Sequence, residues 1–125
     1  MFIRILLAIC LIFTLNSCSK NKKAIYEPTI TVDAYKLYAE GLEAFERNDF
    51  FYANKKFSEA EINFKNVDLA AKAAIMSSFS LYGINFYNEA IQNLERYLKN
   101  YPSDKNVIYA NYLLAIIYFE QITDE

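Results

Sequence analysis

Apolar residues recur at the three- and four-residue spacing of amphipathic helices over most of the chain, from residue 33 onward. The spacing predicts five helices, over residues 33–47, 49–64, 67–83, 86–100 and 105–122. Asn48 and Asn85 each precede the second helix of a pair, which predicts that they are N-cap residues. The segment Asn100–Asp104, which contains Pro102, is a stop signal after the fourth helix. Helices of similar length joined by short polar turns predict helical hairpins.

The second hairpin repeats the first at a shift of 37 residues. The aligned pairs are Phe45 and Tyr82, Asn48 and Asn85, Phe50 and Tyr87, Ala53 and Ala90, and Phe57 and Leu94. A second shift of the same size places Ala115 on Ser78 and Phe119 on Tyr82. The pattern resembles the tetratricopeptide repeat, although its period is longer than the usual ~34 residues. We therefore expect an all-α solenoid of about two and a half repeats: 33–66, 67–104 and an incomplete 105–125.

Small residues recur where the two helices of such a hairpin approach most closely. Ala53 and Ala90 occupy this position on the second helices, and larger side chains there would overpack the seam. The residues expected to face the same seam from the first helices are Gly41, Ser78 and Ala115. Phe57 and Leu94 are expected to fill the gap to the next hairpin.

The first helix of each hairpin carries the candidate binding residues, because tetratricopeptide arrays line their concave groove with this helix. The groove positions read Tyr35, Tyr38, Leu42 and Phe45, then Lys72, Ile75, Phe79 and Tyr82, then Tyr109, Tyr112, Ile116 and Phe119. Tyrosine offers contact area and a hydrogen-bonding tip at low entropic cost. The candidates for a peptide groove are Tyr35, Tyr38, Phe45, Phe79, Tyr82, Tyr109 and Tyr112. The alternative is that curvature of the array buries several of them, which is the favoured interpretation for Ile75 and Leu42.

The N-terminus has the pattern of a secretion signal. A basic start that ends at Arg4 precedes the apolar stretch Ile5–Leu15, whose length as a helix is about 16 Å, against the ~30 Å of a bilayer core. Leu15-Asn16-Ser17-Cys18 resembles a bacterial lipobox, which implies cleavage before Cys18 and acylation of its thiol. This predicts a signal peptide over 1–17 and a lipid-anchored tether over 18–32, the alternative being an uncleaved anchor with an incidental cysteine. By the same resemblance, Ser19 in place of aspartate favours the outer membrane.

Composition excludes several classes of protein. The 125 residues include no histidine, which removes the commonest general base, and only two glycines. A net charge of −2 gives no reason to expect a nucleic-acid partner. Glu59 and Glu61 point to different faces of one helix, so they form no acid–base pair. Cys10 lies in the removed segment, so the mature chain has no free thiol and no recognisable set of catalytic residues. We expect no enzyme activity, no metal and no cofactor other than the lipid on Cys18.

Three segments, together with the lipobox, resemble the BamD (YfiO/ComL) family of outer-membrane assembly lipoproteins: Ala34–Phe57, Ala90–Pro102 and Asn106–Thr123. The resemblance implies a periplasmic scaffold of the β-barrel assembly machine, tied to the outer membrane, that binds BamA and accessory lipoproteins. It also implies that the N-terminal repeats receive the C-terminal targeting segments of unfolded outer-membrane proteins. The alternatives are a pilot lipoprotein for a secretin or pilus, and a periplasmic adaptor for cell-wall hydrolases.

Members of that family continue for several more helices, whereas this sequence stops at Glu125, after the first helix of its third repeat. Repeat arrays generally need at least three units and a polar cap. We therefore expect the sequence to be a fragment or a truncated reading frame that lacks the family's docking surface for partner subunits.

Overall fold

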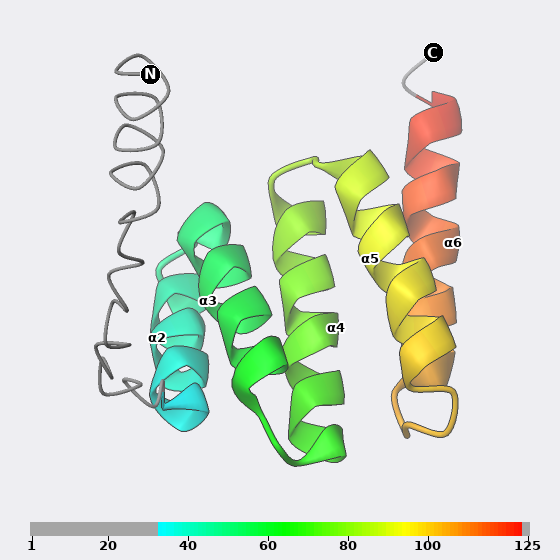
Figure 1. Ribbon diagram of the computed structural model, residues 1–125. Helices are drawn as coiled ribbons and strands as arrows, with labels where there is room; N and C mark the ends of the chain where they lie inside the picture. The colour runs from blue at the N-terminus through cyan, green and yellow to red at the C-terminus, as the bar shows by residue number, and fades with distance from the viewer. Residues whose placement is uncertain (1–32, 124–125) are drawn as a thin grey trace, which may run out of the picture. The chain divides into compact units, whose positions relative to one another are not determined.

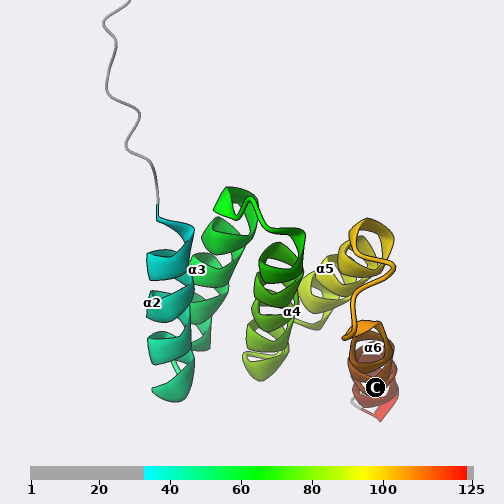
Figure 2. The same ribbon diagram turned by 90° about the horizontal axis from the view of Figure 1, so that it is seen from below.

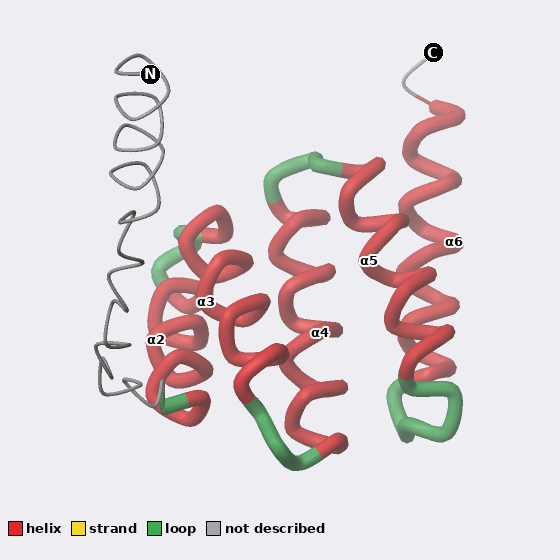
Figure 3. Tube along the Cα trace, viewed as in Figure 1, coloured by secondary structure: helices red, strands yellow, loops and turns green. Residues whose placement is uncertain are grey.

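The computed structural model describes residues 33–123, which form five α-helices and no strand (Figures 1 and 3). The helices are α2 (Ala34–Glu46), α3 (Phe50–Asn63), α4 (Val67–Gly83), α5 (Tyr87–Asn100) and α6 (Val107–Thr123). Each boundary lies within two residues of the one predicted from the apolar spacing. The all-α prediction is thus confirmed for this part of the chain. The predicted signal peptide, Cys18 and the tether lie outside the described residues.

The helices follow one another as a layered array. α3 packs against both α2 and α4, and α5 packs against both α4 and α6. Seen from below in Figure 2, α2, α4 and α6 lie toward one side of the array, and α3 and α5 lie toward the other. This is the zigzag of stacked helical hairpins, so the three first helices share one face. None of the helices within residues 33–123 combines the length and apolar character that crossing a bilayer requires.

The small residues of the hairpin seams are buried as predicted. Ala53 and Ala90 are both fully buried, and a β-carbon on Gly41 would lie 2.8 Å from Cδ1 of Phe57. Phe57 and Leu94 have no exposed surface, which confirms their place in the core. The layers can therefore approach closely because backbone or a methyl group, and not a long side chain, faces the aromatic rings.

Ala115 is a correction to the predicted seam. The aligned residues Gly41 and Ser78 are buried, whereas Ala115 is exposed. α6 packs on α5 and α4, and no further helix of the described residues covers its other side. That side carries several exposed apolar side chains: Ile108, Tyr112, Phe119 and Ile122.

The helix caps are a second correction, because Asn48 and Asn85 are not N-cap residues. Both adopt the left-handed conformation, each with φ of 60°. The Asn48 N–H donates to the carbonyl of Phe45 (3.0 Å), and the Asp49 N–H donates to the carbonyl of Ala44 (2.9 Å). This pair of hydrogen bonds is the Schellman motif, which closes the C-terminus of α2. The N-cap of α3 is Asp49, whose side chain accepts from the Tyr52 N–H (3.2 Å).

The same motif ends α4. Asn85 donates its N–H to the carbonyl of Tyr82 (3.0 Å), and Phe86 donates to the carbonyl of Leu81 (3.0 Å). Asparagine tolerates the left-handed region because its short polar side chain bonds locally. The two asparagines are therefore equivalent in the repeat, but they end the first helix and do not begin the second.

Two polar networks connect the hairpins. Buried Ser77 of α4 donates to Oδ1 of Asn54 (2.7 Å) on α3 and accepts from Nδ2 of Asn93 (3.0 Å) on α5. Glu61 of α3 accepts two hydrogen bonds from the Arg96 guanidinium of α5 (2.6 and 2.8 Å). Because the Ser77–Asn54 and Arg96–Glu61 bonds run from the second hairpin to the first, they fix the register in which the hairpins stack.

Candidate functional site: an aromatic face across three helices

Aromatic rings from the three first helices form a continuous row on their shared face. The ring of Phe45 on α2 lies 5.6 Å from that of Phe79 on α4, and Phe79 lies 6.5 Å from Tyr109 on α6. Phe45 and Phe79 are half-buried, and Tyr109 is 43% exposed. We call Phe45, Phe79 and Tyr109 the aromatic row. Its rings are held by neighbouring helices while part of each remains open to solvent.

At the α2 end, Tyr35 and Tyr38 both pack against Phe64, at ring distances of 5.2 and 6.2 Å. Tyr35 remains 67% exposed, whereas Tyr38 is half-buried and also contacts Phe57 at 5.3 Å. Burial raises the pKa of the Tyr38 hydroxyl above its usual value. Tyr38 is therefore partly a core residue, and Tyr35 offers the larger accessible ring.

At the other end of α4, Tyr82 has an internal role as well. Its hydroxyl donates to Oε1 of Glu120 on α6 (2.8 Å), and the Tyr87 hydroxyl donates to Oε2 of the same carboxylate (2.9 Å). The hydrogen bond to Glu120, with burial, raises the pKa of Tyr82 to about 12. The polar tip of Tyr82 is thus committed to linking α4 with α6. The last candidate, Tyr112 on α6, is 63% exposed.

A pocket lies between α4 and the start of α6, beside the aromatic row. Its volume is about 410 Å³, and its lining residues are Lys72, Ile75, Met76, Lys105, Asn106 and Tyr109. Ile75 is buried, as the sequence favoured, and Tyr109 is shared with the aromatic row. We call this cavity the α4–α6 pocket. It joins an apolar lining to two lysine side chains.

Sequence reasoning missed three members of this pocket. Lys105 and Asn106 lie in the loop before α6, and Met76 lies outside the groove positions of its helix, so none of the three belongs to the groove pattern. Lys72 did fall on a groove position, and its Nζ lies 5.4 Å above the ring of Tyr38. A cation at this distance from an aromatic face is held there by the ring's quadrupole.

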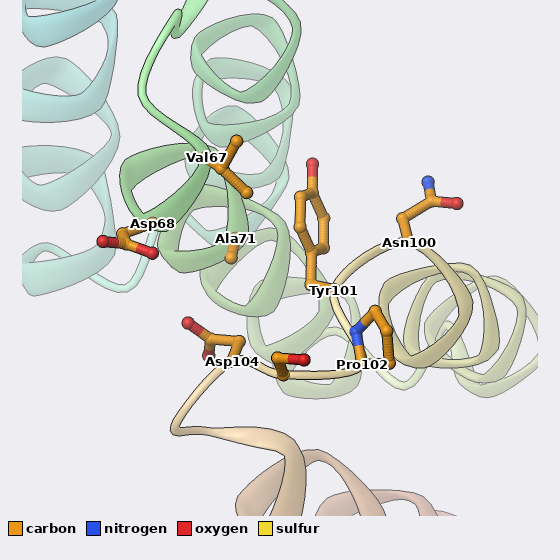
Figure 4. Close-up of a pocket in the computed structure, with 8 residues that line it drawn as sticks. Val67, Asp68, Ala71, Asn100, Tyr101, Pro102 and Asp104 are labelled. Carbon is orange, nitrogen blue, oxygen red and sulfur yellow. The ribbon is translucent and has the colours of Figure 1, made fainter.

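A smaller pocket of about 180 Å³ lies where the second hairpin meets the loop before α6 (Figure 4). Tyr101 stands in it beside Val67 and Ala71 of α4, and its hydroxyl donates to Oε1 of Glu61 (2.9 Å). Burial and this hydrogen bond raise the pKa of Tyr101 to about 12. Asp104 accepts from the Tyr97 hydroxyl (2.5 Å) and from the Asn106 backbone N–H (2.9 Å). The polar groups here are used to hold the hairpin, so this pocket is structural.

Comparison with known proteins identifies the family. The model of the YfiO family, described as outer membrane lipoprotein, matches residues 31–125. The chain belongs to the YfiO family. This confirms the BamD-family resemblance inferred from the lipobox and the three repeat segments, and membership supports association with the outer membrane.

Curated YfiO relatives carry the name outer membrane protein assembly factor BamD. The protein of Caulobacter vibrioides is 34% identical over 88 residues, which are 70% of this chain and 29% of that protein. The Rickettsia prowazekii protein is 26% identical over 112 residues, 88% of this chain and 43% of that protein. The Neisseria gonorrhoeae protein is 26% identical over 120 residues, 94% of this chain and 45% of that protein. The chain thus spans less than half the length of these relatives. No solved structure gives a significant match.

Proposed function

We propose that this chain is the N-terminal repeat region of a scaffold lipoprotein for outer-membrane β-barrel assembly. Within it, the face of α2, α4 and α6 binds the C-terminal targeting segment of an unfolded outer-membrane protein. The relatives' name, outer membrane protein assembly factor, supports the general role. The aromatic row supports the specific role, binding of the targeting segment, because it crosses all three first helices.

The spacing of the row suits an extended peptide. In an extended chain, alternate side chains point to the same side and lie about 6.6–6.8 Å apart. The ring spacings of 5.6 and 6.5 Å in the row are close to this repeat. A peptide that crosses the helices can therefore place successive same-side aromatic residues over successive rings, where offset or edge-to-face contacts are favourable. Tyr35 and Tyr112 are both more than half exposed, and their hydroxyls can donate to or accept from the peptide backbone.

The matched tyrosines Tyr109 and Tyr118 provide the test. Both lie on α6 and both are 43% exposed, but the Tyr118 hydroxyl faces Glu95 of α5 (3.5 Å), on the outer side. We expect Tyr109→Ala to weaken binding of a fluorescent peptide with a barrel-protein C-terminal sequence by about fivefold or more. Tyr118→Ala should leave the affinity within twofold. Fluorescence anisotropy measures both. Equal effects of the two substitutions, or no binding by the parent chain, would contradict the peptide-groove proposal and favour the pilot or adaptor alternatives.

The scaffold is proposed to be anchored through Cys18, with the repeats facing the periplasm. In the longer protein, the partners would be a BamA-like subunit and accessory lipoproteins. Incorporation of labelled palmitate in bacteria tests the anchor. Cys18→Ala should abolish the label and release the protein from membranes, whereas Cys10→Ala should retain both label and membrane association. Labelling that survives Cys18→Ala would refute the anchor.

A further inference from the structure

The α4–α6 pocket has a charge that the groove hypothesis does not explain. Lys72 and Lys105 both line it, and no carboxylate does. Within the described residues, neither lysine has a carboxylate oxygen within 4 Å. Three other cations of the array are paired: Lys56 with Glu40 at 2.7 Å, Arg96 with Glu61 at 2.6 Å, and Arg47 with Glu43 at 2.7 Å. The pocket therefore presents two positive charges that internal pairing leaves available to an anion.

Two nearby acidic groups offset part of this charge and form no ion pair with either lysine. Asp68 and Asp104 line the adjoining pocket, together with both lysines. The Asp104 carboxylate accepts from the Tyr97 hydroxyl and from the Asn106 side chain (3.0 Å). Those bonds and the charge of Lys105 outweigh its burial and lower the pKa of Asp104, so Asp104 remains a hydrogen-bonded anion that also interacts with Lys105. Lys72, for its part, is directed toward the ring of Tyr38, at 5.4 Å.

The apolar lining fits one large side chain. Ile75, Met76 and Tyr109 form it, and the volume of about 410 Å³ is within the range of small ligand sites. Thioether sulfur makes favourable contacts with aromatic rings, and Tyr109 adds a ring of its own. An aromatic side chain next to a negative group is the ligand that matches both the lining and the two lysines.

We propose that the α4–α6 pocket binds the last residue of the targeting segment, with its aromatic side chain on Ile75, Met76 and Tyr109 and its free carboxylate between Lys72 and Lys105. This inference rests on the proposed function and adds the direction in which the peptide binds. Because Tyr109 belongs to both the pocket and the aromatic row, the residues before the C-terminus continue over Phe79 and Phe45, toward α2. The chain end, and not only the aromatic content, then determines which peptides bind.

The experiment compares two peptides of identical sequence that end in phenylalanine, one with a free carboxylate and one amidated. Anisotropy titrations use the full chain in mild detergent at low salt. We expect the free acid to bind roughly tenfold more tightly, as charge-assisted hydrogen bonds from two lysines allow. Salt at about 0.5 M should reduce the difference, because exposed charges are screened.

Three variants test the residues. Lys72→Gln and Lys105→Gln should each weaken binding of the free acid by about three- to tenfold and leave the amidated peptide within twofold. Lys55→Gln, at an exposed lysine on α3, should change neither affinity. Equal binding of acid and amide by the parent chain overturns this inference alone. An equal loss in Lys55→Gln and Lys72→Gln overturns it too, since net charge would then be sufficient. Failure of both peptides to bind overturns the proposed function together with this inference.

Discussion

The ring of Phe57 packs directly on the backbone of α2 at Gly41, where a β-carbon would lie 2.8 Å from ring atoms Cδ1 and Cε1. Phe57 has no exposed surface, so its ring has no space into which it could retreat. Gly41→Ala should destabilise the fold by about 1–3 kcal/mol through overpacking, net of the gain in helix propensity. Urea unfolding followed by circular dichroism measures the change.

Gly83 is the matched control for this prediction. It also lies on a first helix, but it is exposed, and a β-carbon there would be 3.0 Å from Cδ2 of the partly buried Phe50. Gly83→Ala should therefore cost clearly less than Gly41→Ala. If the two variants unfold at the same urea concentration, the close approach at Gly41 does not limit the seam.

Asn48 occupies a left-handed turn with φ of 60°. Two substitutions there should therefore have different effects on stability. Asn48→Gly should leave stability unchanged or raise it by a few tenths of a kcal/mol, because glycine enters this region without a steric penalty. Asn48→Ala should cost about 1 kcal/mol, because alanine keeps the β-carbon that is strained in this region and loses the polar side chain through which asparagine bonds locally. Thermal denaturation of both variants checks the order. A more stable alanine variant would show that the turn opens.

The ion pair between Glu61 and Arg96 should stabilise the fold through its hydrogen-bond geometry as well as through its charge. The Glu61 side chain is 5% exposed and Arg96 is 41% exposed, so removal of the arginine leaves a largely buried carboxylate with only the Tyr101 hydroxyl. Arg96→Ala should cost about 1–3 kcal/mol. Arg96→Lys should recover little of it, since lysine cannot donate the two parallel bonds of 2.6 and 2.8 Å.

Arg47 provides the comparison on the surface. It pairs with Glu43 one helical turn away, at 2.7 Å, with both side chains more than half exposed. Arg47→Ala should change stability by less than about 0.5 kcal/mol. Urea titrations of the two alanine variants compare their losses in the free energy of unfolding. A larger loss for Arg96→Ala would show that burial of the ion pair matters, and equal losses would contradict that.

The helices and their seams could be predicted from the sequence because each depends on local residue preferences or on a periodic pattern. Apolar spacing located all five helices, and the 37-residue shift found the equivalent positions Ala53 and Ala90. The sequence could not show whether each asparagine ends the first helix or begins the second, since asparagine is favourable both before a helix and after one. The left-handed φ of Asn48 and the hydrogen bond from the Asp49 N–H to the Ala44 carbonyl distinguish the two.

The candidate site divides in the same way. Repeat positions placed Phe45, Phe79 and Tyr109 on one face, because the first helices share an orientation in every hairpin. The commitment of Tyr82 to Glu120, and the approach of Lys105 to Lys72 at one pocket, join residues far apart in the chain. Such pairings depend on how the hairpins stack, and no spacing rule encodes them.

Tyrosine hydroxyls that donate to carboxylates predict an alkaline limit to stability. The pKa values of Tyr82 and Tyr101 are raised from 10.0 to about 12, by the bond to Glu120 and burial for Tyr82, and by burial and the bond to Glu61 for Tyr101. The folded state therefore keeps its protons where the unfolded chain has lost them. Since stability falls with pH wherever the native state binds more protons, the contribution is complete below pH 10 and is lost between about pH 10 and 12.

Urea unfolding at a series of pH values from 8 to 12 measures this dependence. We expect the free energy of unfolding to change little through the Tyr82 hydroxyl up to pH 10 and then to decrease. Tyr82→Phe removes one titrating group, so its curve should decrease less steeply above pH 10 than that of the parent chain. The Glu120 carboxylate keeps the hydrogen bond from Tyr87 in this variant, which limits the cost at neutral pH. Parallel curves for parent and variant would mean that the Tyr82–Glu120 bond does not form in solution.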